Sequence, residues 1–127
     1  MFRVMGAVDV PGGFVVAAHV QHLTGKPWAM SARIVLPQNV AGQRVLLEPR
    51  GSRRLTSPTL LDLRVSRRIP CGRVGDIALT LDVLNLLNST AEEELASDDR
   101  TNTNFGRPSV FTDPRRAMFG IRLNLGR

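Results

Sequence analysis

The sequence predicts an all-β fold, an antiparallel meander of about seven strands. Apolar and polar residues alternate strictly over Asp76–Val83 and over Met118–Leu125, which is the pattern of a strand with one apolar and one polar face. Turn-forming residues recur at fairly regular intervals along the chain, as they do between the strands of a meander. Periodicity and turn spacing therefore indicate the same fold class.

Each expected strand is a run of alternating or β-branched residues that ends at a cluster of Gly, Pro, Asp or Asn. In chain order the expected strands are Phe2 to Val8, Phe14 to His22, Ala29 to Leu36, Gln43 to Leu47, Thr59 to Ile69, Val74 to Leu84 and Met118 to Leu125. We expect the fifth and sixth to pair as an antiparallel hairpin, because only a tight turn separates them.

The polar faces of these strands carry ionised groups, as the inner wall of a water-filled barrel does. Asp62, Arg64, Asp82 and Arg122 all fall on such faces, and we interpret them as an ion-pair network rather than as a catalytic pair of carboxylates. A spanning strand needs only about 9 to 11 residues, far fewer than a spanning helix. The sequence therefore predicts that the meander is part of a larger transmembrane β-barrel.

The connections between the strands alternate in length. Those near Pro11, Pro37 and Pro70 are short, and the others are longer on average, with 89–114 the longest. Outer-membrane barrels have short turns on one side and longer loops on the other. We therefore expect 89–114 to be a long extracellular-type loop, within which a short helix over Ala91–Ala96 is compatible with the composition.

The charge is strongly basic, with a net charge of +6 and a single lysine, Lys26, among 17 basic residues. We interpret the arginines as belonging to solvated loops and a charged lumen. Tyrosine is absent, and only Trp28 and five phenylalanines could stack on bases, so no nucleic-acid partner is expected. The absence of tyrosine also counts against a barrel, because aromatic girdles usually mark its two membrane interfaces.

No motif indicates an enzyme. The segment 25–27 is not a phosphate-binding loop, because Val20 stands where that loop needs glycine and no hydroxyl residue follows Lys26. His19 and His22 are three apart, which places them on opposite faces of a strand and excludes a shared metal ion. Cys71, the only cysteine, lies in a turn and is expected to be a passive thiol. We therefore expect no catalytic, cofactor-binding or metal site.

The segment Leu81–Asn88, with the sequence LDVLNLLN, resembles the D-V-x-N-L-x-N element found near the C-terminus of TonB-dependent outer-membrane receptors. Further segments are similar to other parts of that region in the same order, namely LTGKPW at 23–28, EPRGSRRL at 48–55, LDLRVS at 61–66, FGRP at 105–108, PRR at 114–116 and FGIRL at 119–123. These segments are spread from residue 23 to residue 123, so the resemblance extends over nearly the whole chain.

The resemblance implies that residues 1–127 are the C-terminal strand block of a 22-stranded barrel in the outer membrane of a Gram-negative bacterium. In the intact protein such a barrel imports a scarce nutrient with energy from the inner-membrane TonB complex. The implied partners are outer-membrane lipid, the upstream barrel and plug segments, the barrel-assembly machinery and, through the plug alone, the TonB complex. The first residues lack the apolar core of a signal peptide, so we expect a fragment that does not transport by itself.

Two alternatives stay open. The chain could be a small soluble arginine-rich β-domain that binds an acidic partner or nucleic acid, or a complete small barrel with an eighth strand to close it. A soluble domain packs its apolar face inward, whereas a barrel fragment leaves that face to lipid. The environment of the apolar face therefore separates these alternatives.

Overall fold

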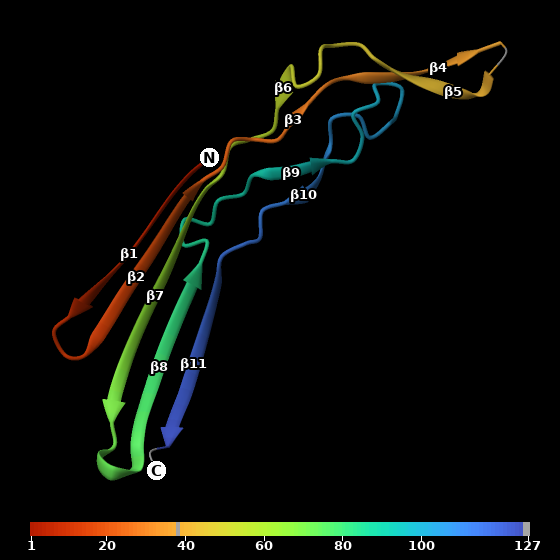
Figure 1. The fold of residues 1–127 in the computed structure, drawn as a ribbon. Coiled ribbons are helices and arrows are strands. Elements are labelled where there is room, and N and C mark those ends of the chain that lie inside the picture. Colours follow the sequence, from red (N-terminus) through yellow and green to blue (C-terminus); the bar gives the residue numbers. More distant parts are fainter. Residues whose placement is uncertain (38, 126–127) are drawn as a thin grey trace. The chain divides into compact units, whose positions relative to one another are not determined.

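The computed structural model describes residues 1–37 and 39–125, and these form eleven strands, one short 3₁₀ turn and no α-helix (Figure 1). The strands are β1 (Phe2–Val10), β2 (Phe14–His22), β3 (Pro27–Trp28), β4 (Ser31–Leu36), β5 (Asn39–Leu46), β6 (Arg53–Arg54), β7 (Thr59–Pro70), β8 (Gly75–Leu84), β9 (Glu92–Leu95), β10 (Pro108–Phe111) and β11 (Arg116–Leu125). All the strand pairings are antiparallel. The prediction of an all-β, antiparallel fold is confirmed.

The chain divides into two compact units. Unit 1 comprises Met1–Leu23, Thr59–Ser89 and Asp113–Arg127, and unit 2 comprises Thr24–Pro58 and Thr90–Thr112. The strands β1, β2, β7, β8 and β11 belong to unit 1, and the six shorter ones belong to unit 2.

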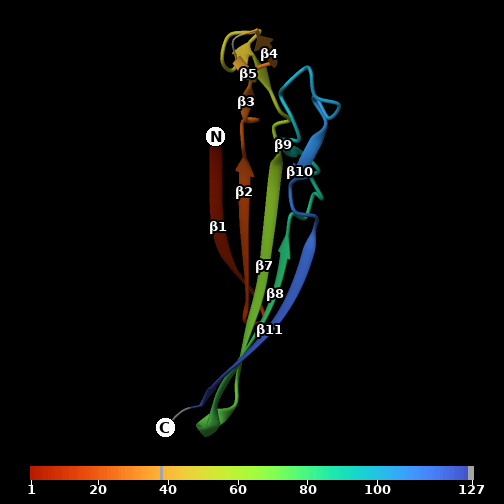
Figure 2. The same cartoon turned by 90° about the vertical axis from the view of Figure 1, so that its right-hand side faces the viewer.

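Unit 1 is one open sheet in the order β1-β2-β7-β8-β11. Its five strands lie side by side in a single layer, with β1 and β11 at the two edges (Figure 1, Figure 2). Short turns over 11–13 and 71–74 join strands at one end of the sheet, whereas the long connections 23–58 and 85–115 leave from the other end. The expected alternation of short and long connections is therefore present in this sheet.

The expected hairpin of the fifth and sixth predicted strands is confirmed by β7 and β8. Leu63 lies opposite Val83, and Val65 lies opposite Leu81. Because directly opposed residues of an antiparallel pair share a face, the alternation on one strand continues on its neighbour.

The same register holds across all five strands and gives unit 1 a mainly apolar face, which also carries His22, Thr59 and Arg67. The Arg67 guanidinium lies over the Phe14 ring of the same face, with Cζ 4.8 Å from the ring centroid. We call the following residues the apolar face: Phe2, Val4, Val8, Val10, Phe14, Val16, Ala18, Val20, Leu61, Leu63, Val65, Ile69, Ile77, Leu79, Leu81, Val83, Phe119, Ile121, Leu123 and Leu125. The opposite side, the polar face, carries Arg3, Asp9, His19, Gln21, Asp62, Arg64, Ser66, Arg68, Asp76, Thr80, Asp82, Arg116, Arg122 and Asn124.

Unit 2 consists of three two-stranded pairs, β3–β6, β4–β5 and β9–β10. Ser31 joins its two chain segments and is fully buried. The Ser31 N–H donates to the carbonyl of Asp98 at 2.9 Å, and the Arg100 N–H donates to the carbonyl of Ser31 at 2.8 Å. These backbone bonds hold 24–58 and 90–112 together as one unit.

Two details of the expected architecture are wrong. The strands expected at Ala29–Leu36 and Gln43–Leu47 are β4 and β5, but they pair with each other in unit 2 instead of extending the sheet, so the meander has five strands and not seven. Part of the turn expected between them, Gln38, lies outside the described residues. The segment 89–114 contains the pair β9–β10, and β9 occupies the place of the helix considered over Ala91–Ala96.

The hydrophobic core is very small. Among the described residues the buried hydrophobic side chains are Ala29 and Ala91, both in unit 2. Among the described residues, no apolar side chain on the sheet of unit 1 is buried. The helices of the described residues include none whose length and hydropathy would let it cross a membrane.

Candidate functional site

The first candidate site is the apolar face of unit 1. On β11 the side chains of Phe119, Ile121 and Leu123 are 67 %, 62 % and 64 % exposed, and on β1 those of Phe2 and Val8 are 61 % and 60 % exposed. Contiguous apolar surface of this kind marks a place where protein or membrane docks. The arrangement provides a single-layer sheet with one largely apolar face.

The polar face holds ion pairs that run across neighbouring strands. Arg64 on β7 pairs with Asp82 on β8, with Nη2 donating to Oδ2 at 3.0 Å. Further along the same two strands, Arg68 Nε lies 3.5 Å from Asp76 Oδ2, which also accepts a hydrogen bond from Asn124 Nδ2 at 2.9 Å. Cross-strand pairs of opposite charge stabilise a sheet modestly, and here they make the polar face of the sheet a charged one.

The other residues considered from the sequence also lie where the alternation predicts. His19 is on the polar face with Nδ1 3.6 Å from Asp62 Oδ2, whereas His22 is on the apolar side. Arg122 is on the polar face opposite Ala78. The described residues contain no group of three or more His, Cys, Asp or Glu side chains that could hold a metal ion.

Two asparagines, Asn85 and Asn88, hold the segment that follows β8 in place. Asn85 and Asn88 have φ of 48° and 51°, a left-handed conformation that asparagine tolerates better than most residues. The Asn85 carboxamide donates to the carbonyls of Ser89 at 3.0 Å and Asp113 at 2.8 Å. Asn88 Oδ1 accepts from the N–H of Arg115 at 3.1 Å. The motif therefore joins the end of β8 to the residues that lead into β11.

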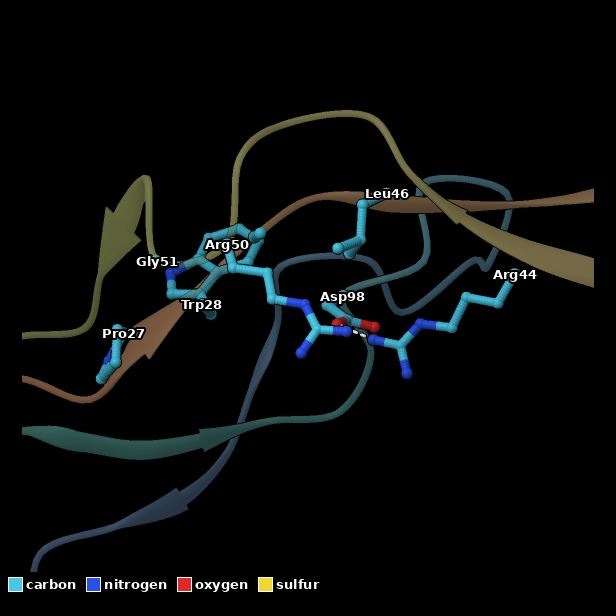
Figure 3. A pocket seen from close by; sticks show the side chains of 8 residues that line it. Pro27, Trp28, Arg44, Leu46, Arg50, Gly51 and Asp98 are labelled. Atoms are coloured by element: carbon cyan, nitrogen blue, oxygen red, sulfur yellow. Dashed lines mark hydrogen bonds and ion pairs between the residues drawn. The ribbon is translucent and has the colours of Figure 1, made fainter.

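The second candidate site is a pocket of about 600 Å³ in unit 2 (Figure 3). It is lined by Pro27, Trp28, Ala29, Arg44, Leu46, Arg50, Gly51 and Asp98. These residues come from β3 and the segment that follows it, from β5, from the turn before β6 and from the loop after β9. The volume lies in the range of small-molecule sites.

One ion pair crosses this pocket. The Arg44 guanidinium donates to the Asp98 carboxylate (Figure 3). Arg44 Nε also donates to Ser31 Oγ at 3.1 Å. Ser31 Oγ in turn donates to Asp98 Oδ1 at 3.2 Å. Because Ser31 is fully buried, it fixes the position of both charged groups.

A second ion pair supports the aromatic side of the pocket. Arg53 Nε lies 2.8 Å from Glu48 Oε2, and Ser52 Oγ donates to the same oxygen at 2.9 Å. The hydrogen bond from Arg53 is the main reason why the pKa of Glu48 is lowered from 4.5 to about 2. The Arg53 guanidinium also lies over the Trp28 ring, with Cζ 5.2 Å from the ring centroid, a cation–π contact.

The sequence pattern did not reveal this pocket. Trp28 and Arg50 belong to segments that resemble parts of the receptor family, but Asp98 lies in the long polar stretch 89–114. The only local signal is the single tryptophan in an arginine-rich chain. The site depends on pairing between strands of unit 2 that are far apart in the sequence. The alternation of apolar and polar residues does not predict which strands pair.

Comparison with protein-family models, with curated proteins and with solved structures finds no match for this chain.

Proposed function

We propose that the sheet of unit 1 is a section of the wall of a transmembrane β-barrel in a Gram-negative outer membrane. The apolar face contacts lipid, and the polar face borders a water-filled lumen. One observation carries this proposal: a single register places apolar side chains of all five strands on one face, interrupted by Arg67 and His22, and the other charged groups of β1, β7, β8 and β11 on the opposite face. Alternation of this kind is typical of barrel strands in the outer membrane.

The dimensions of the strands support the proposal. The five strands contain 9, 9, 12, 10 and 10 residues in chain order, and a tilted strand needs about 9 to 11 residues to cross the hydrocarbon layer. Short turns at one end and long connections at the other match the periplasmic and extracellular sides of such barrels.

Exposure of the apolar face favours this proposal over a soluble arginine-rich domain. A soluble sheet of this kind must cover its apolar face, because leaving it in water costs about 25 cal/mol per Å². Phe119, Ile121 and Leu123 are more than half exposed, and the described residues include no buried hydrophobic side chain on the sheet. Lipid would remove this surface from water without any further protein layer.

We further propose that the intact protein is a TonB-dependent receptor that takes up a ligand. The support is the ordered set of receptor-like segments, above all Leu81–Asn88, whose asparagines close the end of β8. The sheet is open at β1 and β11, and in a bilayer every backbone donor and acceptor needs a partner. Further strands must therefore complete the barrel, and this section alone does not transport.

Folding with and without an amphiphile tests the proposal. The purified chain is diluted from urea into buffer, into detergent micelles and into lipid vesicles, and sheet content is followed by far-ultraviolet circular dichroism. We expect a cooperative β-sheet transition with micelles or vesicles and aggregation in buffer. A monomeric, soluble and cooperatively folded chain in buffer alone would show that the membrane proposal is wrong.

A further inference from the structure

The pocket in unit 2 combines an apolar wall with an excess of positive charge. Trp28, Ala29 and Leu46 supply apolar surface, and Arg44, Arg50 and Asp98 supply the charges (Figure 3). Two guanidinium groups against one carboxylate leave the lining with a net positive charge.

The guanidinium groups near the tryptophan differ in what they already bind. Arg44 is held by Asp98 and Ser31, and Arg53 is held by Glu48. Arg50 has no hydrogen bond or ion pair with the part of the chain that the structure describes. Figure 3 shows its side chain extending across the pocket toward the Arg44–Asp98 pair. Its five N–H donors are therefore free to bind an anion.

The fixed parts of the pocket suit a ligand with a flat ring. The Trp28 indole is held by Arg53 on its face and by Phe105, whose ring centroid is 6.2 Å away at an interplanar angle of 65°. A ring held in this way offers stacking surface without first losing side-chain freedom. A planar guanidinium matches a carboxylate with two parallel hydrogen bonds.

We propose that this pocket binds a small aromatic carboxylate. The ring lies against Trp28 and Leu46, and the carboxylate accepts hydrogen bonds from Arg50. The inference goes beyond the proposed function, because it concerns unit 2 alone and stands whether or not the sheet crosses a membrane.

The chain contains its own reporter for this test. Trp28 is the only tryptophan and tyrosine is absent, so emission excited at 295 nm comes from the pocket. The full chain, folded in buffer or in detergent micelles, whichever gives its cooperatively folded state, is titrated with benzoate, with benzamide as the neutral analogue and with acetate as the anion without a ring. We expect saturable quenching by benzoate, with clearly weaker binding of both analogues.

The variant Arg50→Gln removes the free guanidinium from an exposed side chain, and Arg107→Gln removes one of equal charge from unit 2 outside the pocket lining. We expect Arg50→Gln to weaken benzoate binding about tenfold or more, as expected for the loss of a charged hydrogen bond, and Arg107→Gln to bind as the unaltered chain does. Equal affinity for benzoate and benzamide, unchanged binding by Arg50→Gln, or no saturable quenching by benzoate would overturn the proposal.

Discussion

Replacement of Asn85 measures how strongly the segment after β8 holds the end of the sheet. This side chain is 5 % exposed. Its Nδ2 donates to the carbonyls of Ser89 and Asp113 at 3.0 Å and 2.8 Å, and its Oδ1 accepts from the Ser89 N–H at 2.9 Å. Asn85→Ala deletes all three hydrogen bonds and also places alanine at a φ of 48°.

The expected loss can be divided into two parts. A hydrogen bond contributes about 1 kcal/mol net, so three give about 3 kcal/mol. Alanine in the left-handed region adds about 1 kcal/mol, which glycine avoids. We therefore expect Asn85→Ala to lower the free energy of unfolding by about 4 kcal/mol and Asn85→Gly to lower it by about 3 kcal/mol.

Urea unfolding from detergent micelles, followed by circular dichroism of the sheet, gives both values. The alanine and glycine variants serve as controls for each other, since both lack the carboxamide and they differ only in their effect on the backbone. If both variants unfold within about 0.5 kcal/mol of the unaltered chain, the size expected of an ordinary surface substitution, Asn85 does not fasten the end of β8.

Three further predictions concern the sheet and unit 2. Leu79→Arg on the apolar face should destabilise the chain in lipid vesicles by about 2 to 4 kcal/mol, whereas Thr80→Arg on the polar face should cost much less; equal losses in urea titrations would contradict the assignment of faces. Gly25→Ala should prevent native unit 2 from forming, because a Cβ there would lie 1.7 Å from a backbone oxygen, and native Trp fluorescence in this variant would refute the close approach. The pKa of Glu48 falls from 4.5 to about 2 on folding, so its ion pair with Arg53 stabilises unit 2 above pH 4.5, and this stabilisation is lost as the pH falls toward 2. Acid titration of the Trp28 fluorescence should therefore show a transition that the variant Glu48→Gln lacks.

The individual strands of unit 1 were predictable because their alternation is regular, but the pairing of β2 with β7 was not predicted. The β7–β8 hairpin follows from strict alternation on both sides of a tight turn, and β8 was expected from Val74 and begins at Gly75. The apolar face follows from the same alternation, because each paired strand repeats it.

Unit 2 was not predictable in the same way. Alternation over Ala29–Leu36 identifies a strand but not its partner, so β4 and β5 were assigned to the main sheet. Glu92, Glu93 and Glu94 have low strand propensity, and β9 forms there because β10 pairs with it and the Thr112 N–H donates to the carbonyl of Ala91 at 2.9 Å. Tertiary hydrogen bonds override local preference in this segment, and the pocket around Trp28 depends on them.

The most direct test of the membrane proposal is the depth of neighbouring residues on β11. Trp28→Phe removes the native fluorophore, and a single tryptophan is then placed by Ile121→Trp on the apolar face or by Arg122→Trp on the polar face. Both variants are folded into lipid vesicles with and without brominated acyl chains, which quench tryptophan on contact. We predict strong quenching at position 121 and weak quenching at 122; equal quenching at the two positions, or stronger quenching at 122, would contradict a lipid-facing apolar face.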